Sequence, residues 1–183
     1  MKEVYLPLAE KVKNFNISLT EADILNFLKI KRRWPIRYPS GQPGVEIITN
    51  NGDMRSELFF EASGYIDYKK WKHFYDLGYT TIISNVLDLT EELRNLSHLI
   101  KDHVGNDINA NFYFGKPGQK PSFDLHTHHY HVIVKQIYGA AEWICGDKKL
   151  ILKPGETLWI PKEAPHAVVS KEEAKLSLTL NCE

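Results

Sequence analysis

Histidines are concentrated in one short stretch of this sequence, His126-Thr127-His128-His129-Tyr130-His131. In an extended strand alternate side chains share a face, so His126 and His128 point the same way, with about 6–7 Å between their Cα atoms. Two imidazoles at this spacing can bind one metal ion at about 2.0–2.2 Å, provided that another strand supplies a third ligand. His129 and His131 then face the other way, and we expect them to support the site or to lie at the surface.

The segment that must position these histidines has the character of a β-structure. From Ile108 onward, short apolar and β-branched runs alternate with turn residues, and glycines stand where the chain must turn. This spacing is typical of a β-sandwich or barrel. The predicted strands cover residues 109–114, 123–137, 142–145, 148–152, 157–160, 167–170 and 175–180.

Two helices are predicted before this region. Residues 18–21, Ser-Leu-Thr-Glu, have the form of a capping box, and the apolar residues that follow at helical spacing predict a helix over residues 20–30. Asp88 offers a second cap, ahead of apolar residues at helical spacing up to Ile100, and Gly105 ends that helix.

Strands are also predicted in the first hundred residues. Residues 45–49 and 57–60, on either side of the Asn51-Gly52 turn signal, predict a hairpin, and residues 79–86 are apolar and β-branched enough for a buried strand. No repeat or linker divides the chain, so its 183 residues predict a single domain. We expect a helical and strand lead-in over about residues 1–107 and a metal-binding barrel core over about residues 108–181.

Composition and charge exclude several classes of protein. A hydrophobic fraction of 43% with 25% charged residues is ordinary for a globular protein, and Lys+Arg 23 against Asp+Glu 23 gives no net charge to favour nucleic acid or an anionic membrane. No apolar run resembles a signal peptide or a membrane span. Cys145 and Cys182 lack metal-site spacing, so we expect reduced thiols and a cytoplasmic protein. The sequence leaves open whether the chain forms a homodimer.

The motifs around the histidines resemble those of a known superfamily. Residues 126–139 resemble the first motif of the cupin superfamily, which runs His-x-His, three or four residues, glutamate, six residues, glycine; Val132 stands at the place of the glutamate. Residues 155–166 resemble the second cupin motif, with its glycine, proline and histidine in register at Gly155, Pro161 and His166. This resemblance makes His166 the expected third ligand.

A closer resemblance is to the JmjC-type, cupin-like hydroxylases, and it spans roughly residues 20–181. The residues that carry it are His126–Tyr130, Val134–Gly139, Trp143, Leu152–Pro161 and His166. The resemblance implies a mainly β, α+β fold: a double-stranded β-helix, or cupin barrel, with N-terminal helices packed on its outside. It also implies a non-haem iron centre near the mouth of that barrel.

The second ligand departs from the pattern of this family. The family has His-x-Asp or His-x-Glu, whereas here the second position is His128. Two neutral imidazoles and a carboxylate leave a divalent iron centre with a charge of about +1, while three imidazoles leave about +2. A more positive centre favours an anionic substrate or co-substrate. Three-histidine cupins include iron dioxygenases that need no 2-oxoglutarate, and others that hold nickel, manganese, copper or zinc.

The cation with which the family holds 2-oxoglutarate is also missing. That lysine or arginine lies between the glycine and the tryptophan after the first motif, where this chain has Ala140, Ala141 and Glu142. Lys135 should face outward from a regular strand, and the other cations that a loop could bring to the mouth are Arg32, Arg33, Arg37 and Lys116. A buried carboxylate without a cation costs several kcal/mol, so use of 2-oxoglutarate does not follow from the resemblance.

These observations together predict an enzyme. The expected function is that of a mononuclear Fe(II)-dependent oxygenase, a hydroxylase or dioxygenase, which uses dioxygen on a small metabolite or an amino-acid side chain. His126, His128 and His166 are the expected metal ligands, no further catalytic residue is assigned, and the pocket is expected to include Asn109, Asn111, Tyr113 and Tyr130. The alternative is a metal-binding cupin of another class: an isomerase, a lyase or a non-catalytic small-molecule binding module. A further alternative is that the histidines bind no metal and are buried structural residues.

Overall fold

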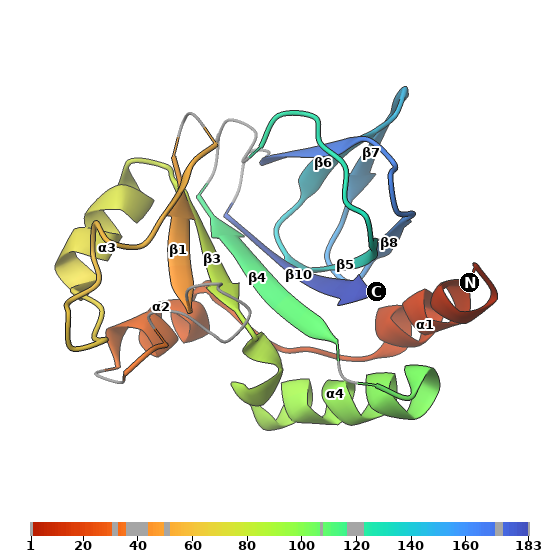
Figure 1. Cartoon of the computed structure of the whole chain (residues 1–183), viewed down its shortest axis with the longest axis horizontal. Helices are drawn as coiled ribbons and strands as arrows, with labels where there is room; N and C mark the ends of the chain where they lie inside the picture. The colour runs from red at the N-terminus through yellow and green to blue at the C-terminus, as the bar shows by residue number, and fades with distance from the viewer. Residues whose placement is uncertain are drawn as a thin grey trace.

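The computed structural model describes residues 2–30, 33–35, 44–49, 52–106, 108–116, 123–170 and 174–182, and these residues form two antiparallel β-sheets with helices on one side (Figure 1). The strands are β1 (Val45–Ile48), β2 (Met54–Arg55), β3 (Thr80–Ser84), β4 (Asn109–Gly115), β5 (His131–Tyr138), β6 (Ala141–Cys145), β7 (Lys148–Leu152), β8 (Thr157–Ile160), β9 (His166–Ser170) and β10 (Lys175–Cys182). The helices are α1 (Lys2–Asn14), α2 (Glu21–Lys29), α3 (Tyr68–Asp76) and α4 (Glu91–Val104), with the 3-10 helix η1 (Val86–Asp88) before α4.

The strands alternate between the two sheets as the chain proceeds. Among the described residues, seven strands form one sheet in the order β2-β1-β3-β4-β10-β5-β8, and three form the other in the order β7-β6-β9. After β5 the chain crosses to the small sheet, returns for β8, crosses again for β9 and returns for β10. This winding is the double-stranded β-helix, and the predicted fold class, mainly β with helices outside, is confirmed.

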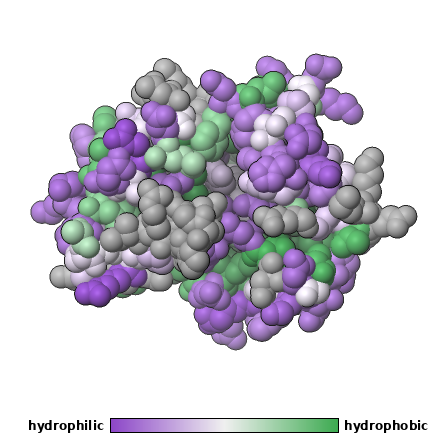
Figure 2. All heavy atoms as spheres, viewed as in Figure 1, coloured by the Kyte–Doolittle hydropathy of each residue, from purple (hydrophilic) through white to green (hydrophobic). Residues whose placement is uncertain are grey.

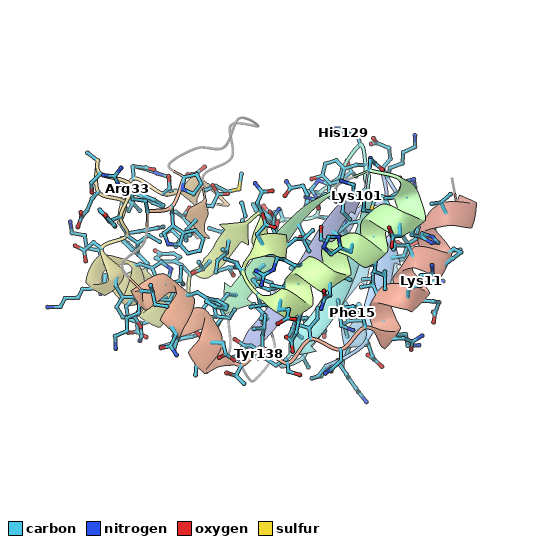
Figure 3. All side chains as sticks on the ribbon, turned by 90° about the horizontal axis from the view of Figure 1, so that it is seen from below. Lys11, Phe15, Arg33, Lys101, His129 and Tyr138 are labelled. Atoms are coloured by element: carbon cyan, nitrogen blue, oxygen red, sulfur yellow. The ribbon has the colours of Figure 1, made fainter. Side chains whose placement is uncertain are left out.

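Helices α1 and α4 cover the outer face of the large sheet. They lie side by side across its strands in Figure 3, and α1 contacts β5, β8 and α4. The helix residues Leu8, Val12, Leu93, Leu96 and Ile100 are buried against the sheet, where they contribute to the main hydrophobic core. Full burial of one such side chain stabilises the fold by about 1.5–3 kcal/mol.

Strand β10, which lies between β4 and β5 in the large sheet, has two chemically different faces. Leu176, Leu178 and Leu180 are fully buried and belong to the core under the helices. The alternate residues Lys175, Ser177, Thr179 and Asn181 therefore point the other way, toward the small sheet. The polar side of this strand lies inside the barrel because the helices cover its apolar side.

Both predicted helices form, but the residues that cap them differ from the prediction. The structure has Thr20 as the N-cap of α2, where its hydroxyl accepts from the Asp23 amide while the Asp23 carboxylate accepts from the Thr20 amide. The prediction of Ser18 was wrong because an aspartate three residues after a threonine closes the same reciprocal pair. Thr90 rather than Asp88 caps α4, and Gly105 ends that helix at φ +82° as expected.

Two predicted strands have different limits in the structure. The partner of β1 is residues 54–55 rather than 57–60, because Ile47 pairs with Arg55 directly across the short turn. Asn51 of that turn lies outside the described residues. The strand predicted over 123–137 begins only at His131, so His126 and His128 lie in the bend that leads into β5.

Candidate metal centre and its pocket

Three histidines come together at the mouth of the barrel. One ligand atom from each of His126, His128 and His166 lies within 4.8 Å of the others. The backbones of His126 and His166 form a two-hydrogen-bond bridge, with N–O distances of 3.0 and 2.9 Å, which fixes the bend beside β9. This bridge, rather than the alternation of a strand, aligns the first ligand with the third.

Backbone carbonyls set the tautomer of two of these rings. The Nδ1 atom of His126 lies 2.8 Å from the Asp124 carbonyl, and that of His166 lies 2.9 Å from the Ala164 carbonyl. A carbonyl only accepts, so each Nδ1 carries the hydrogen and each Nε2 keeps its lone pair. The third ring, His128, stacks on Tyr130 with 4.8 Å between centroids and 10° between planes.

Burial favours the neutral form of two of these imidazoles, His128 and His166. Burial lowers the pKa of His128 to about 4, with a further contribution from the nearby His166 and His126. Burial also lowers the pKa of His166, although its hydrogen bond to Ala164 opposes the shift. Metal ions bind the neutral imidazole, and three neutral nitrogens facing one point suit iron, zinc, copper or nickel. The donor set therefore fits a divalent transition metal.

A cavity of about 460 Å³ opens beside the histidines, between the two sheets. Three of the four residues expected in the pocket line it, namely Asn111, Tyr113 and Tyr130. Asn109 is not among the described residues that line it, although it alternates with the other two on β4. It stands at the start of this strand, opposite Asn181, which does line the cavity. The face of the molecule in Figure 2 is mostly hydrophilic, with smaller hydrophobic areas between.

A lysine that was not predicted from the sequence also belongs to this cavity. Lys175 lines it and is only 2% exposed. Burial alone lowers the pKa of its ammonium group to about 8. A signal existed in the sequence, because Lys175 begins a strict polar–apolar alternation and shares a face with Ser177, Thr179 and Asn181.

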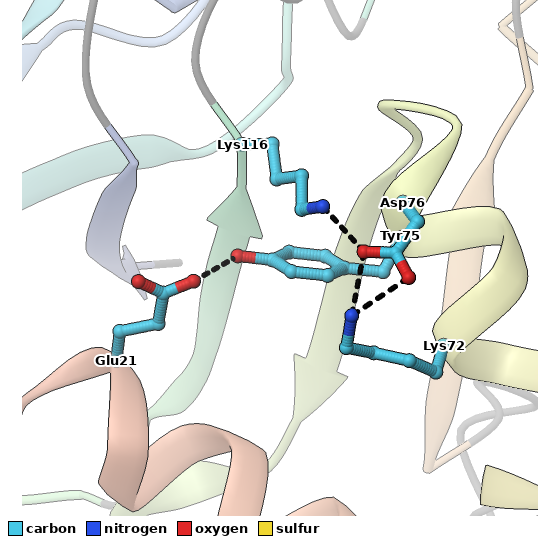
Figure 4. Close-up of polar contacts among 5 residues, drawn as sticks. All are labelled: Glu21, Lys72, Tyr75, Asp76 and Lys116. Carbon is cyan, nitrogen blue, oxygen red and sulfur yellow. Dashed lines mark hydrogen bonds and ion pairs between the residues drawn. The ribbon is translucent and has the colours of Figure 1, made fainter. Parts of the chain in front are cut away.

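The cations considered from the sequence lie elsewhere. Lys135 points away from the cavity, as expected, but is buried under α1, where its Nζ donates to the carbonyls of Val12 and Lys13 at 3.0 Å. Lys116 pairs with Asp76, which also binds Lys72 (Figure 4).

Arg33, shown in Figure 3, lies over the ring of Tyr65, and Arg32 and Arg37 fall outside the described residues. None of these described cations lines the cavity.

His131 and His129 have different roles in the structure. His131 is buried between the rings of Tyr5 and Trp159, and its Nδ1 accepts from the Lys162 amide at 3.3 Å. It packs the outer face of the large sheet, whereas His129 is exposed. Neither belongs to the described three-histidine group.

Comparison with known proteins agrees with this architecture. Residues 115–180 match the family model for the Cupin domain. By sequence, no curated protein matches the chain. Among the described helices, none has both the length and the apolar character that crossing a bilayer requires.

Solved structures similar to this one include two of ycfD from Escherichia coli. One is 16% identical, covers 93% of this chain and 47% of that chain, and has a TM-score of 0.63. The other, of YcfD as a ribosomal oxygenase in complex with cobalt and succinic acid, is 15% identical, covers 93% of this chain and 45% of that chain, and has a TM-score of 0.60.

A third similar structure is the DMSP lyase DddQ from Ruegeria pomeroyi, which is 23% identical, covers 42% of this chain and 38% of that chain, and has a TM-score of 0.39. The chain spans less than half the length of each of these proteins. The likeness to ycfD shows a shared fold across nearly the whole chain.

Proposed function

We propose that this protein is a mononuclear non-haem iron-dependent oxygenase, a hydroxylase or dioxygenase, that acts on a small metabolite or an amino-acid side chain. The observation that carries the proposal is the group of three buried or half-buried imidazoles at the edge of a 460 Å³ cavity. His126, His128 and His166 are the proposed ligands. The similarity in fold to a ribosomal oxygenase over 93% of this chain supports the proposal.

The residues of the chain have separate tasks in this function. Hydrogen bonds to Asp124 and Ala164 orient two of the rings, and the stacked Tyr130 ring holds the third. Three protein ligands leave coordination positions open on the cavity side. Bound iron would supply the activation of dioxygen there. Trp143, whose ring stacks near His166, forms part of the cavity wall beside the ligands.

The second candidate function is that of a metal-dependent cupin of another class, such as an isomerase, a lyase or a binding module. The donor set itself favours keeping this candidate, because three imidazoles suit zinc, nickel and copper as well as iron. The two candidates differ in their use of oxygen.

Metal analysis and oxygen uptake test the proposal together. The purified full-length protein is expected to bind about one iron per chain after anaerobic loading, and His166→Ala is expected to lose most of it. The exposed His129 provides the matched control, because His129→Ala should keep the metal. Circular dichroism shows whether each variant remains folded.

Oxygen consumption by the iron-loaded protein is then measured with panels of small acids, amino acids and peptides. Substrate-dependent uptake that is lost in His166→Ala supports the oxygenase. Equal metal content in the wild type and His166→Ala contradicts the ligand assignment. Turnover of a substrate without oxygen uptake assigns the protein to the second class.

A further inference from the structure

Lys175 is a buried cation without a counter-ion. Its side chain is 2% exposed and lines the cavity, and within the described part of the chain it makes no hydrogen bond or ion pair. Buried lysines are rare unless they are paired, because a charged ammonium group loses its hydration when it leaves water. The cavity therefore contains a positive group whose partner is not supplied by the described residues.

The backbone around Lys175 is built to hold it in this position. Gly139, at the end of β5, lies so close to β10 that a Cβ atom there would stand 2.0 Å from the carbonyl oxygen of Ala174. The pairing of β10 with β5 shifts register between Leu176 and Ser177. The close approach and the shift fix the start of β10, so Lys175 is held toward the interior of the barrel and is not free to reach solvent.

Tyr113 is the neighbouring group best placed to assist Lys175. It stands opposite Ser177 across β4 and β10, so it is the diagonal neighbour of Lys175 on the same face, about 7–8 Å away and within reach of two long side chains. Its hydroxyl can donate a hydrogen bond into the cavity that both residues line. Ser177 is less available, because its hydroxyl donates to Gln136 Oε1 at 2.8 Å.

Neither acidic residue that lines the cavity neutralises Lys175, and one of them, Glu57, is paired with Arg55. Glu46 also lines the cavity, but it lies on β1, and its neighbour Ile82 on β3 separates it from Tyr113. Glu46 has other interactions, whereas Lys175 has none that would join the two. No described carboxylate therefore compensates the positive charge at the start of β10.

Lys175 and the histidines lie toward opposite ends of the cavity. Leu176, next to Lys175, pairs with Tyr138 at the end of β5, whereas Cys182 pairs with His131, three residues after His128. Figure 3 shows His129 and Tyr138 at opposite ends of this strand. A divalent metal bound by three neutral ligands would keep its charge of about +2, so positive charge would then stand at both ends of the cavity.

We infer that Lys175 and Tyr113 form a binding site for a carboxylate group, and that the ligand of this cavity is a short acid with a second anionic or metal-binding end directed toward the histidines. The part of this inference that directs the ligand toward a metal at the histidines rests on the function proposed above. The carboxylate site at Lys175 and Tyr113 does not. The carboxylate belongs either to the substrate or to an oxo-acid co-substrate. This cation comes from the last strand of the barrel, not from the position after the first histidine motif where the sequence analysis sought it.

Calorimetric titration of the full-length protein tests the carboxylate site, with glutarate as the dicarboxylate probe, with and without anaerobically bound Fe(II). The wild type should bind glutarate even without metal. Lys175→Met should weaken binding about ten- to hundredfold, the usual effect of losing one charge-assisted hydrogen bond, and Lys175→Arg should restore much of it. Lys148→Met, at an exposed position on β7, is the matched control and should bind as the wild type does.

The outcomes separate this inference from the proposed function. Equal glutarate affinity in wild type and Lys175→Met, or no binding to either form of the protein, overturns the carboxylate site even if oxygen uptake is observed. Binding that depends on Lys175 supports the site even if the protein consumes no oxygen. Tyr113→Phe should weaken glutarate binding less than Lys175→Met does, because it removes a neutral donor.

A comparison of 2-oxoglutarate with glutarate identifies the source of the carboxylate. An oxo-acid co-substrate can bind iron through its oxo and carboxylate oxygens, so Fe(II) should then strengthen binding of 2-oxoglutarate much more than that of glutarate, with a new visible charge-transfer absorption. If Fe(II) gives 2-oxoglutarate no such advantage over glutarate and Lys175 still matters, the carboxylate belongs to the substrate.

Discussion

Removing the buried charge of Lys175 should stabilise the ligand-free protein. Lys175→Met keeps an unbranched side chain of similar length in a cavity that already accommodates one, and it removes an ammonium group that has no partner among the described residues. Burial lowers the pKa of this ammonium from 10.5 to about 8. At about 1.4 kcal/mol per pH unit, this shift corresponds to a penalty of about 3 kcal/mol for the charged form.

The pH dependence of this penalty follows from its sign. Between about pH 8 and 10.5 the unfolded chain binds the lysine proton and the folded chain does not, so the free energy of unfolding of the wild type rises with pH across this interval. Below about pH 8 both states are charged and the full penalty applies. Lys175→Met should therefore be more stable than the wild type by up to about 3 kcal/mol at pH 7, and the difference should fall toward zero near pH 10.5.

Urea unfolding followed by circular dichroism at pH 7, 8.5 and 10 measures this difference, with Lys148→Met as the control at an exposed site. Other groups titrate in this range, but they do so in both proteins, and the difference between the two isolates Lys175. A Lys175→Met protein that is less stable than the wild type at pH 7, or a difference that does not depend on pH, would refute the reasoning that the ammonium is buried without a partner.

Three further predictions concern the frame of the site and its charge. Gly139→Ala should lower the free energy of unfolding by several kcal/mol, because the new Cβ would stand 2.0 Å from the Ala174 carbonyl oxygen at a backbone φ of +64°. Thermal unfolding measures this loss. Gly146→Ala is the control, because Gly146 also has a positive φ, +57°, but has open space around it, so the comparison separates the clash from the backbone strain. Since burial lowers the pKa of His128 to about 4, protons should compete with the metal for this ring only near that pH, and NMR of the metal-free protein at pH 5 should show the His128 imidazole still neutral. His128→Asp lowers the charge of the metal centre by one and should weaken glutarate binding to the iron-loaded protein while iron is retained; a variant that holds iron and binds glutarate as tightly as the wild type would contradict a role for the third imidazole in ligand affinity.

The sequence predicted the histidines that meet in the structure, but for a reason that the structure corrects. His126 and His128 were expected on one face of a strand, whereas they lie in a bend before β5. The two-hydrogen-bond bridge between the backbones of His126 and His166 depends on residues 40 positions apart, so no local pattern could predict it. The resemblance to the two cupin motifs identified the three histidines, although the pairing that brings them together was not itself predictable.

Helix capping is a second case in which the local sequence alone could not decide, and the predicted capping residue was wrong. Both Ser18 with Glu21 and Thr20 with Asp23 have the spacing of a capping box. Tertiary contacts favour the second, because the shorter helix leaves Leu19 buried in the core and places the Glu21 carboxylate where it accepts a hydrogen bond of 2.7 Å from the Tyr75 hydroxyl (Figure 4).

Lys175 was not predicted because the polar–apolar alternation in β10 allows its polar face to point either to solvent or to a cavity. Which of the two holds depends on which face of the sheet the helices cover. A strand with leucine at every second position and Lys, Ser, Thr and Asn between them is typical of a sheet with one face in the core and one in water. In this fold the helices cover the leucines, and the small sheet faces the polar side, which encloses Lys175 in a cavity. Lys175, which the sequence pattern alone would place in solvent, thus lines the pocket. In a barrel of this kind, the polar residues of a strand whose apolar face lies under the helices are therefore the ones to examine first for contacts with a ligand.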